Sequence, residues 1–267
     1  MVKKLFRHEF NAFWRILFPV WGLLMGISVL GRLIQLFEND TVGYGIVRTS
    51  TIIFYVAALV VSLLFPFVFA IIRYHRNLFT GEGYLSFTLP VTCFQHVLVK
   101  VTTTFAVQLL TLVVGFVSMM VITFGDVFTE IMKAIGYLYP YFYNQLEWGM
   151  NLPFFLLEGL LVLMVAYISE VLLYYACISL GQTFKKNRGL AALGVYFGYY
   201  FVRQVLGTIA ILIGTVIDWE PLMVWVRENT FTAVHVALYG LMVLYALLTV
   251  GYFAISHSVI RRRLNLE

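Results

Sequence analysis

Six long apolar runs separated by short polar joints constrain this chain more than any other feature. A helix needs about 20 predominantly apolar residues to cross about 30 Å of hydrocarbon, and each run reaches that length. The chain is 61% hydrophobic and only 12% charged, which is far more apolar than a soluble domain. We therefore predict an all-α membrane protein with transmembrane helices at 17–37, 51–72, 97–124, 153–184, 190–217 and 230–260.

The distribution of basic residues predicts how these spans are oriented. If both termini lie in the cytoplasm, most of the 18 Lys and Arg residues fall in cytoplasmic segments, as the positive-inside rule requires. This topology predicts a multi-pass protein of a cell membrane. It also accounts for the net charge of +5, so that no nucleic-acid partner is needed.

The segment 3–18 has the pattern of an amphipathic helix that lies on the inner leaflet, with membrane lipid as its partner. Basic and polar side chains lie mostly opposite its apolar face, and Pro19 marks the turn into the first span. The alternative is a frayed tail attracted to the membrane. The residues predicted to contact the membrane interface are Phe6, Phe10, Phe13, Trp14 and Phe18.

The predicted fourth and fifth spans contain three charged residues. An ionised group at mid-bilayer costs around 3 kcal/mol on insertion scales, so such residues need partners or water. Glu170 and Arg203 lie at similar depth on adjacent antiparallel helices, which predicts an intramembrane pair. The pair either fixes helix packing or lines a substrate path. Glu158 lies nearer the outer surface, where it can reach water.

Motifs for catalysis are absent from the sequence. It contains no phosphate loop of the form G-x-x-x-x-G-K-[ST], and its five histidines form no metal-binding or hydrolase motif. The two cysteines have no spacing suited to redox or zinc chemistry. We therefore predict that the chain is not an enzyme, has no catalytic or metal-ligating residues and holds no cofactor of its own.

A polar interruption after the second span reads GEGYLSFTLPVT, from 81 to 92, within a predicted coupling-helix region at 79–92. Thr80 can cap a short helix and Pro90 ends it, although the alternation of apolar residues also fits a strand. In the helical interpretation an apolar face is exposed and must lie on lipid or in a partner's groove. The candidate partner-binding residues are Glu82, Gly83, Tyr84, Leu85, Phe87, Leu89 and Pro90.

These residues, with a basic residue at Arg76 before them and Lys100 after them, resemble the cytoplasmic loop of type 2 ATP-binding-cassette (ABC) exporter permeases. The chain departs from the family pattern where Gly83 directly follows Glu82 and where Tyr84 replaces the usual threonine. The resemblance implies an ABC ATPase subunit as partner, which binds ATP and Mg and moves the spans through the coupling helix. It also implies a second permease subunit, identical or homologous.

Together these features predict a single permease domain over 1–267, the membrane-spanning subunit of an ATP-driven ABC exporter. A chain of this plan without a fused ATPase suits a bacterial inner membrane. The predicted cargo is amphiphilic, drug-like or a peptide, because the outer loops are short and the interior is apolar. The alternatives are an ATP-independent secondary transporter that uses the intramembrane Glu and Arg charges, or a structural assembly subunit.

Overall fold

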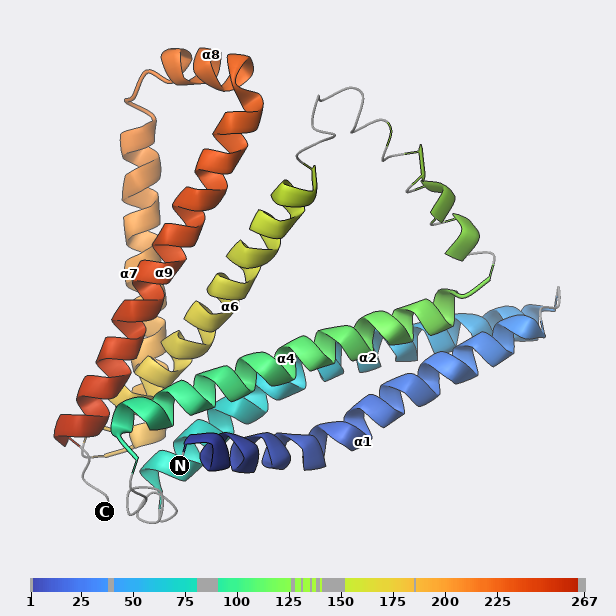
Figure 1. The fold of residues 1–267 in the computed structure, drawn as a ribbon, viewed down its shortest axis with the longest axis horizontal. Helices are drawn as coiled ribbons and strands as arrows, with labels where there is room; N and C mark the ends of the chain where they lie inside the picture. The colour runs from blue at the N-terminus through green and yellow to red at the C-terminus, as the bar shows by residue number, and fades with distance from the viewer. Residues whose placement is uncertain are drawn as a thin grey trace. The chain divides into compact units, whose positions relative to one another are not determined.

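A computed structural model describes residues 2–37, 41–80, 91–125, 128–130, 132–134, 136–137, 140, 152–184 and 186–263. Within these ranges the chain is helical and contains no strand (Figure 1). The helices are α1 (Val2–Leu36), α2 (Val42–Phe79), α4 (Cys93–Thr123), α6 (Leu152–Gly181), α7 (Arg188–Gly214), α8 (Glu220–Glu228) and α9 (Thr230–Arg263).

Six of the described helices are long and apolar enough to cross a membrane: α1, α2, α4, α6, α7 and α9. Each contains one of the predicted spans or most of it, which confirms the all-helical, six-span prediction. Several helices are longer than the hydropathy pattern indicated. The 38-residue α2 is about 57 Å long at 1.5 Å per residue, nearly twice the thickness of the hydrocarbon layer. Hydropathy detects only the part of a helix that suits hydrocarbon, so it underestimates such lengths.

The chain forms two compact units. The first comprises residues 1–74 and 90–145, and the second comprises residues 75–89 and 146–267. The prediction of one permease domain over 1–267 concerns how these units act together and stays a prediction.

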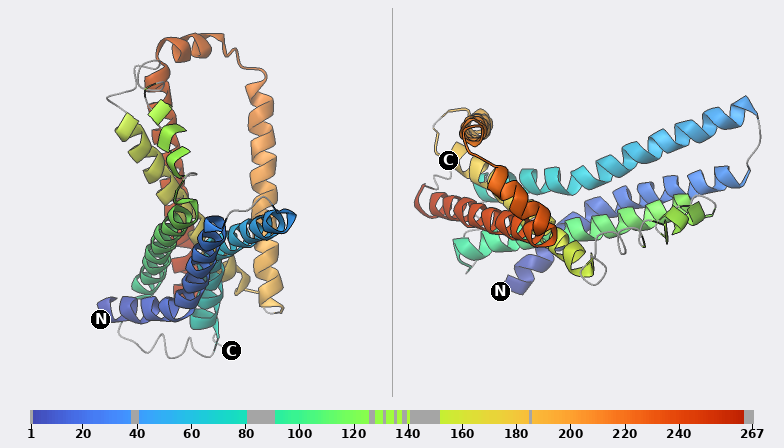
Figure 2. Two further views of the ribbon diagram at one scale, coloured as in Figure 1. Left: turned by 90° about the vertical axis from the view of Figure 1, so that its right-hand side faces the viewer. Right: turned by 90° about the horizontal axis from the view of Figure 1, so that it is seen from above.

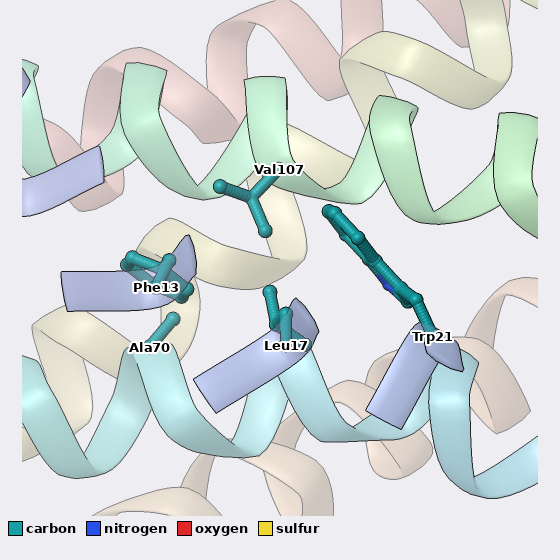
Figure 3. Packing of buried hydrophobic residues seen from close by; sticks show 5 residues of the cluster. All are labelled: Phe13, Leu17, Trp21, Ala70 and Val107. Atoms are coloured by element: carbon teal, nitrogen blue, oxygen red, sulfur yellow. The ribbon is translucent and has the colours of Figure 1, made fainter. Parts of the chain in front are cut away.

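In the first unit, α1, most of α2 and α4 run side by side (Figures 1 and 2). One face of α1 is buried along most of the helix. The residues that form this buried stripe follow one another at intervals of three or four. Phe13, Leu17 and Trp21 from this stripe enclose a core with Ala70 of α2 and Val107 of α4 (Figure 3). The buried stripe consists of Glu9, Phe13, Leu17, Trp21, Leu24, Ser28 and Gly31.

The buried face of α4 combines polar side chains with apolar ones, whereas its exposed large side chains are apolar. Trp21 Nε1 donates a hydrogen bond of 3.2 Å to Thr111 Oγ1, and the hydroxyls of Tyr55 and Ser118 are 3.1 Å apart. Lipid tails are as apolar as leucine, so burial of apolar surface does not drive helices together in a membrane. Packing of small residues and interhelical hydrogen bonds take over that role here.

In the second unit, α6 packs against both α7 and α9. The crossing of α6 and α7 is close at Gly181, where a β-carbon would lie 2.6 Å from the backbone of Ala192. The short helix α8 joins α7 to α9 and lies across their ends (Figures 1 and 2). The sequence did not predict α8, because its nine residues are too few to show a clear period.

The N-terminal segment differs from its prediction. Residues 3–18 and the first span were expected to be two helices with a turn at Pro19, but α1 is a single helix that contains Pro19. Its first part is inclined to the rest (Figure 1). A proline inside a helix removes one hydrogen bond and bends the helix without ending it, which accounts for this shape.

Candidate functional site

Glu9 is the one acidic side chain on the buried stripe of α1, and only 4% of it is exposed. It lies one turn before Phe13 and two turns before Leu17, so that its side chain points toward α2 and α4. A carboxylate that is removed from water in this way is costly unless it is paired and hydrogen-bonded.

Two cations from different helices contact the Glu9 carboxylate. Arg73 Nε of α2 lies 2.5 Å from Oε2, and Lys100 Nζ of α4 donates to Oε1 at 3.0 Å. The side chains of Glu9 and Lys100 are each only 6% exposed, and that of Arg73 is 15% exposed. Both carboxylate oxygens are therefore used, and one side chain joins α1, α2 and α4. We call Glu9, Arg73 and Lys100 the ion cluster.

The ion cluster is suited to fixing the positions of helices. Charge-assisted hydrogen bonds are shorter and about twice as strong as neutral ones, and they hold their partners in defined directions. Removal of one member leaves a buried charge without its partner, which typically costs about 3–5 kcal/mol. The three helix segments that carry these residues are thus expected to move together.

The position of the ion cluster along the chain matters as much as its geometry. Arg73 lies near the end of α2 and Lys100 lies near the start of α4, so the two cations flank the predicted coupling region at 79–92. Both flanks of that region are therefore tied to α1 through a single carboxylate.

The predicted partner-binding residues themselves, Glu82, Gly83, Tyr84, Leu85, Phe87, Leu89 and Pro90, lie outside the described residues. Side-chain hydrogen bonds mark the end of α2 and the start of α4, the helices on either side. Thr80 Oγ1 donates to the Arg76 carbonyl at the end of α2, 2.5 Å away. Thr92 and Gln95 form a capping box at the start of α4, in which each side chain bonds the other residue's backbone N–H.

A second polar cluster lies in the second unit, near the start of α6. Glu158 Oε1 accepts a hydrogen bond of 2.6 Å from the Tyr239 hydroxyl, and Glu158 Oε2 contacts His235 Nδ1. The sequence placed Glu158 near the outer surface, where it can reach water. The structure places its carboxylate against two side chains of α9, and its side chain is 13% exposed.

Tyrosines connect the three long helices of the second unit. The hydroxyls of Tyr199 on α7 and Tyr252 on α9 are 2.5 Å apart, and Tyr174 on α6 donates to Tyr196 on α7 at 3.3 Å. Such polar contacts between membrane helices fix their register.

The predicted pair of Glu170 and Arg203 lies beside these tyrosines. Both residues are close enough to the Tyr252 hydroxyl for their charges to act on it. Glu170 is half-buried and Arg203 is exposed, and among the described residues no ion pair joins the two. The structure therefore brings them to the same region without direct contact, and their pairing stays a prediction.

The residues predicted to face the membrane interface on α1 do not all share one environment. Trp14 and Phe18 are exposed, whereas Phe6 and Phe10 are half-buried. Phe13 is only 2% exposed and packs edge to face against Phe69. Phe13 therefore belongs to the protein core, because it lies on the same stripe as Glu9 and Leu17.

Sequence reasoning missed the ion cluster and the contacts of Glu158. A signal for Glu9 was present, since residues 9, 13, 17 and 21 lie on one helix face, and a lone acid on an otherwise apolar stripe must find a cation. No comparable signal pointed to His235, because its partner lies 77 residues away in the sequence. Among the residues that the structure describes, no group of His, Cys, Asp or Glu is arranged to hold a metal ion.

Six candidate transmembrane helices and polar clusters between them define the class of this protein as a multi-pass α-helical membrane protein. Comparisons with family models, characterised proteins and solved structures found no match.

Proposed function

We propose that this chain is the membrane-spanning permease subunit of an ATP-driven exporter. In this proposal a separate nucleotide-binding subunit hydrolyses ATP with Mg, and two permease subunits, identical or homologous, form the path for an amphiphilic, drug-like or peptide cargo. Both termini lie in the cytoplasm, and the host membrane is a bacterial inner membrane.

The observation that carries the proposal is the ion cluster. A subunit that receives force from an external motor needs a firm connection between the docking segment and its spans. Glu9 connects to Arg73 before the region 79–92 and to Lys100 after it. A displacement of that region would therefore move the adjoining parts of α1, α2 and α4 together, as in a rigid-body transition.

The sequence of the same region supports a docking role. The stretch GEGYLSFTLPVT resembles the coupling loop of type 2 ABC exporter permeases, and as a helix it would present an apolar face that needs a partner or lipid. The chain has no phosphate loop of its own, so an ATP-driven function requires a second protein.

The length of α1 supports an N-terminal part that lies at the membrane surface. The helix has 35 residues and is about 52 Å long, whereas about 20 residues suffice to cross the hydrocarbon. The part before Pro19 exceeds what a straight span needs. In the proposed topology this part lies at the inner leaflet.

Copurification tests the proposal directly. The full-length permease is isolated from its host membrane in mild detergent, and bound proteins are identified by mass spectrometry. We expect an ATPase with a phosphate loop at near-equal stoichiometry. Leu85→Asp should abolish its association while the permease remains in the membrane. Val224→Asp on α8, where the side chain is 48% exposed, is the matched control and should retain the ATPase. Isolation of a stable, active permease without any ATPase would refute the proposal.

A secondary transporter is the second candidate, and the ionisable groups of the second unit favour it. Glu158 and His235 join α6 to α9, and Glu170 and Arg203 lie near Tyr252. Carboxylates and histidines within membrane helices are typical of proton relays. Transport by the purified chain in vesicles, driven by an ion gradient without ATP and lost in Glu158→Gln, would favour this function over the first.

A further inference from the structure

The first part of α1 carries three parallel stripes of different chemistry. One stripe contains Glu9, Phe13 and Leu17 and is buried against α2 and α4. A ladder of aromatic rings lies next to it. Cationic side chains lie beyond the ladder, away from the buried stripe. Because the ion cluster fixes the rotation of α1, the two outer stripes point in a defined direction.

The cationic stripe contains Lys3, Arg7 and Arg15 at four-residue spacing, with Lys4 beside it, and all four side chains are exposed. None of them forms an ion pair with an acid in the part of the chain that the structure describes. Four like charges on four helical turns repel one another, and at this density the surface attracts an anionic partner.

The aromatic ladder indicates which kind of anionic partner fits. Neighbouring ring centroids are 6.1 Å apart for Phe6 and Phe10, 6.2 Å for Phe10 and Trp14, and 5.9 Å for Trp14 and Phe18. The ladder becomes more exposed toward the body of α1, where Trp14 is 44% and Phe18 is 61% exposed. Tryptophan and phenylalanine beside basic residues are typical of helices that lie at the boundary between headgroups and acyl chains.

We propose that this face of α1 binds the headgroups of anionic phospholipids, with the four cations on the phosphates and the aromatic ladder in the acyl region. An acidic protein surface would satisfy the cations but would leave Phe18 in water. The helix also continues directly into a candidate transmembrane helix, so its first part is held close to a membrane surface. The proposal does not depend on an ATPase partner.

The test uses full-length protein purified in a zwitterionic detergent and titrated with phosphatidylglycerol or phosphatidylcholine. Binding is measured by native mass spectrometry of the protein–lipid complexes. We expect tighter binding of phosphatidylglycerol, and about a fivefold loss of its affinity for each cation neutralised, since a basic residue near an anionic surface contributes about 1 kcal/mol. Neutralising all four cations with glutamine should remove the preference for the anionic lipid.

Two further variants separate specific binding from general charge. In the charge-matched control, glutamine replaces four cations outside α1: Lys133, Lys186, Arg227 and Arg261. This control should keep the preference. Exchanging lysine for arginine, and arginine for lysine, at the four α1 positions keeps the charge. This variant should also keep the preference for the anionic lipid. The proposal is overturned if the control loses the preference as fully as the α1 variant does, if native protein binds both lipids equally, or if the α1 variant keeps the preference for the anionic lipid.

Discussion

Lys100 Nζ of α4 lies 3.0 Å from Glu9 Oε1 of α1, although the two residues are 91 positions apart in the sequence. The opposite oxygen of the same carboxylate contacts Arg73 of α2. A single acidic side chain thus joins three membrane helices, through residues that precede and follow in the sequence the region predicted to dock a motor protein. The first two predictions concern this contact.

Glu9→Gln should lower the free energy of unfolding by about 3–5 kcal/mol, because it leaves the buried cations Arg73 and Lys100 without their common carboxylate. The measurement is equilibrium unfolding of the purified protein in mixed micelles. Glu130→Gln is the control: it removes an ion pair with Lys133 whose side chains are 71% and 63% exposed. Exposed pairs contribute about 0–1 kcal/mol, so the control should change little. Equal losses in the two variants would contradict a structural role for Glu9.

Replacement of the whole ion cluster by apolar residues should behave differently. In the triple variant Glu9→Leu, Arg73→Met and Lys100→Met, no buried charge remains, so stability should return to within about 1 kcal/mol of the native protein or exceed it. The helices would then lack their directional contacts. If the cluster transmits force, transport should stay impaired in the triple variant although the fold has recovered, as measured by cargo uptake into inside-out vesicles. Full transport in a stable triple variant would show that the cluster only stabilises the fold.

Gly181 allows α6 and α7 to cross closely. Alanine should therefore be tolerated less well at Gly181 than at Gly194. A β-carbon at Gly181 would lie 2.6 Å from the backbone of Ala192, whereas nothing lies within 4 Å of a β-carbon at Gly194. Gly181→Ala should therefore destabilise the second unit by about 1–3 kcal/mol, since backbone cannot move aside as a side chain can. Gly194→Ala should be neutral or stabilise by up to about 1 kcal/mol, because alanine favours helix. Thermal melting of the two variants compares them directly.

The six spans could be predicted because apolar length is a local property of the sequence, and each run is long enough by itself. The ends of the helices could not be predicted in the same way. Beyond the hydrocarbon, α2 continues through polar residues such as Arg73, and only its neighbours decide whether it stays helical. The start of α4 is an exception, because the spacing of Thr92 and Gln95 in the sequence is that of a capping box.

The candidate sites were less predictable, because they depend on which helices meet. Glu170 and Arg203 were predicted to lie at the same depth by counting residues from the turn between their helices. In the structure both lie near Tyr252. Depth does not determine the rotation of a helix, however, and rotation decides whether two side chains touch. Glu9 shows the reverse case: the sequence places it on one helix face with Phe13 and Leu17, but only the packing of α1 on α2 and α4 shows that this face is buried and identifies its partners.

The hydrogen bond between Trp21 and Thr111 gives a last prediction about how the first unit is held together. Trp21 Nε1 donates to Thr111 Oγ1 at 3.2 Å, and Trp21 is also part of the buried core. Trp21→Phe removes the donor together with part of the ring, and Thr111→Val removes the acceptor. A double-mutant cycle isolates the bond from the lost packing. We expect a coupling energy of about 0.6 kcal/mol, the mean for polar contacts between membrane helices, and at most about 1.7 kcal/mol. A coupling of zero would show that Trp21 stabilises the unit through packing alone, and that the polar face of α4 serves another purpose.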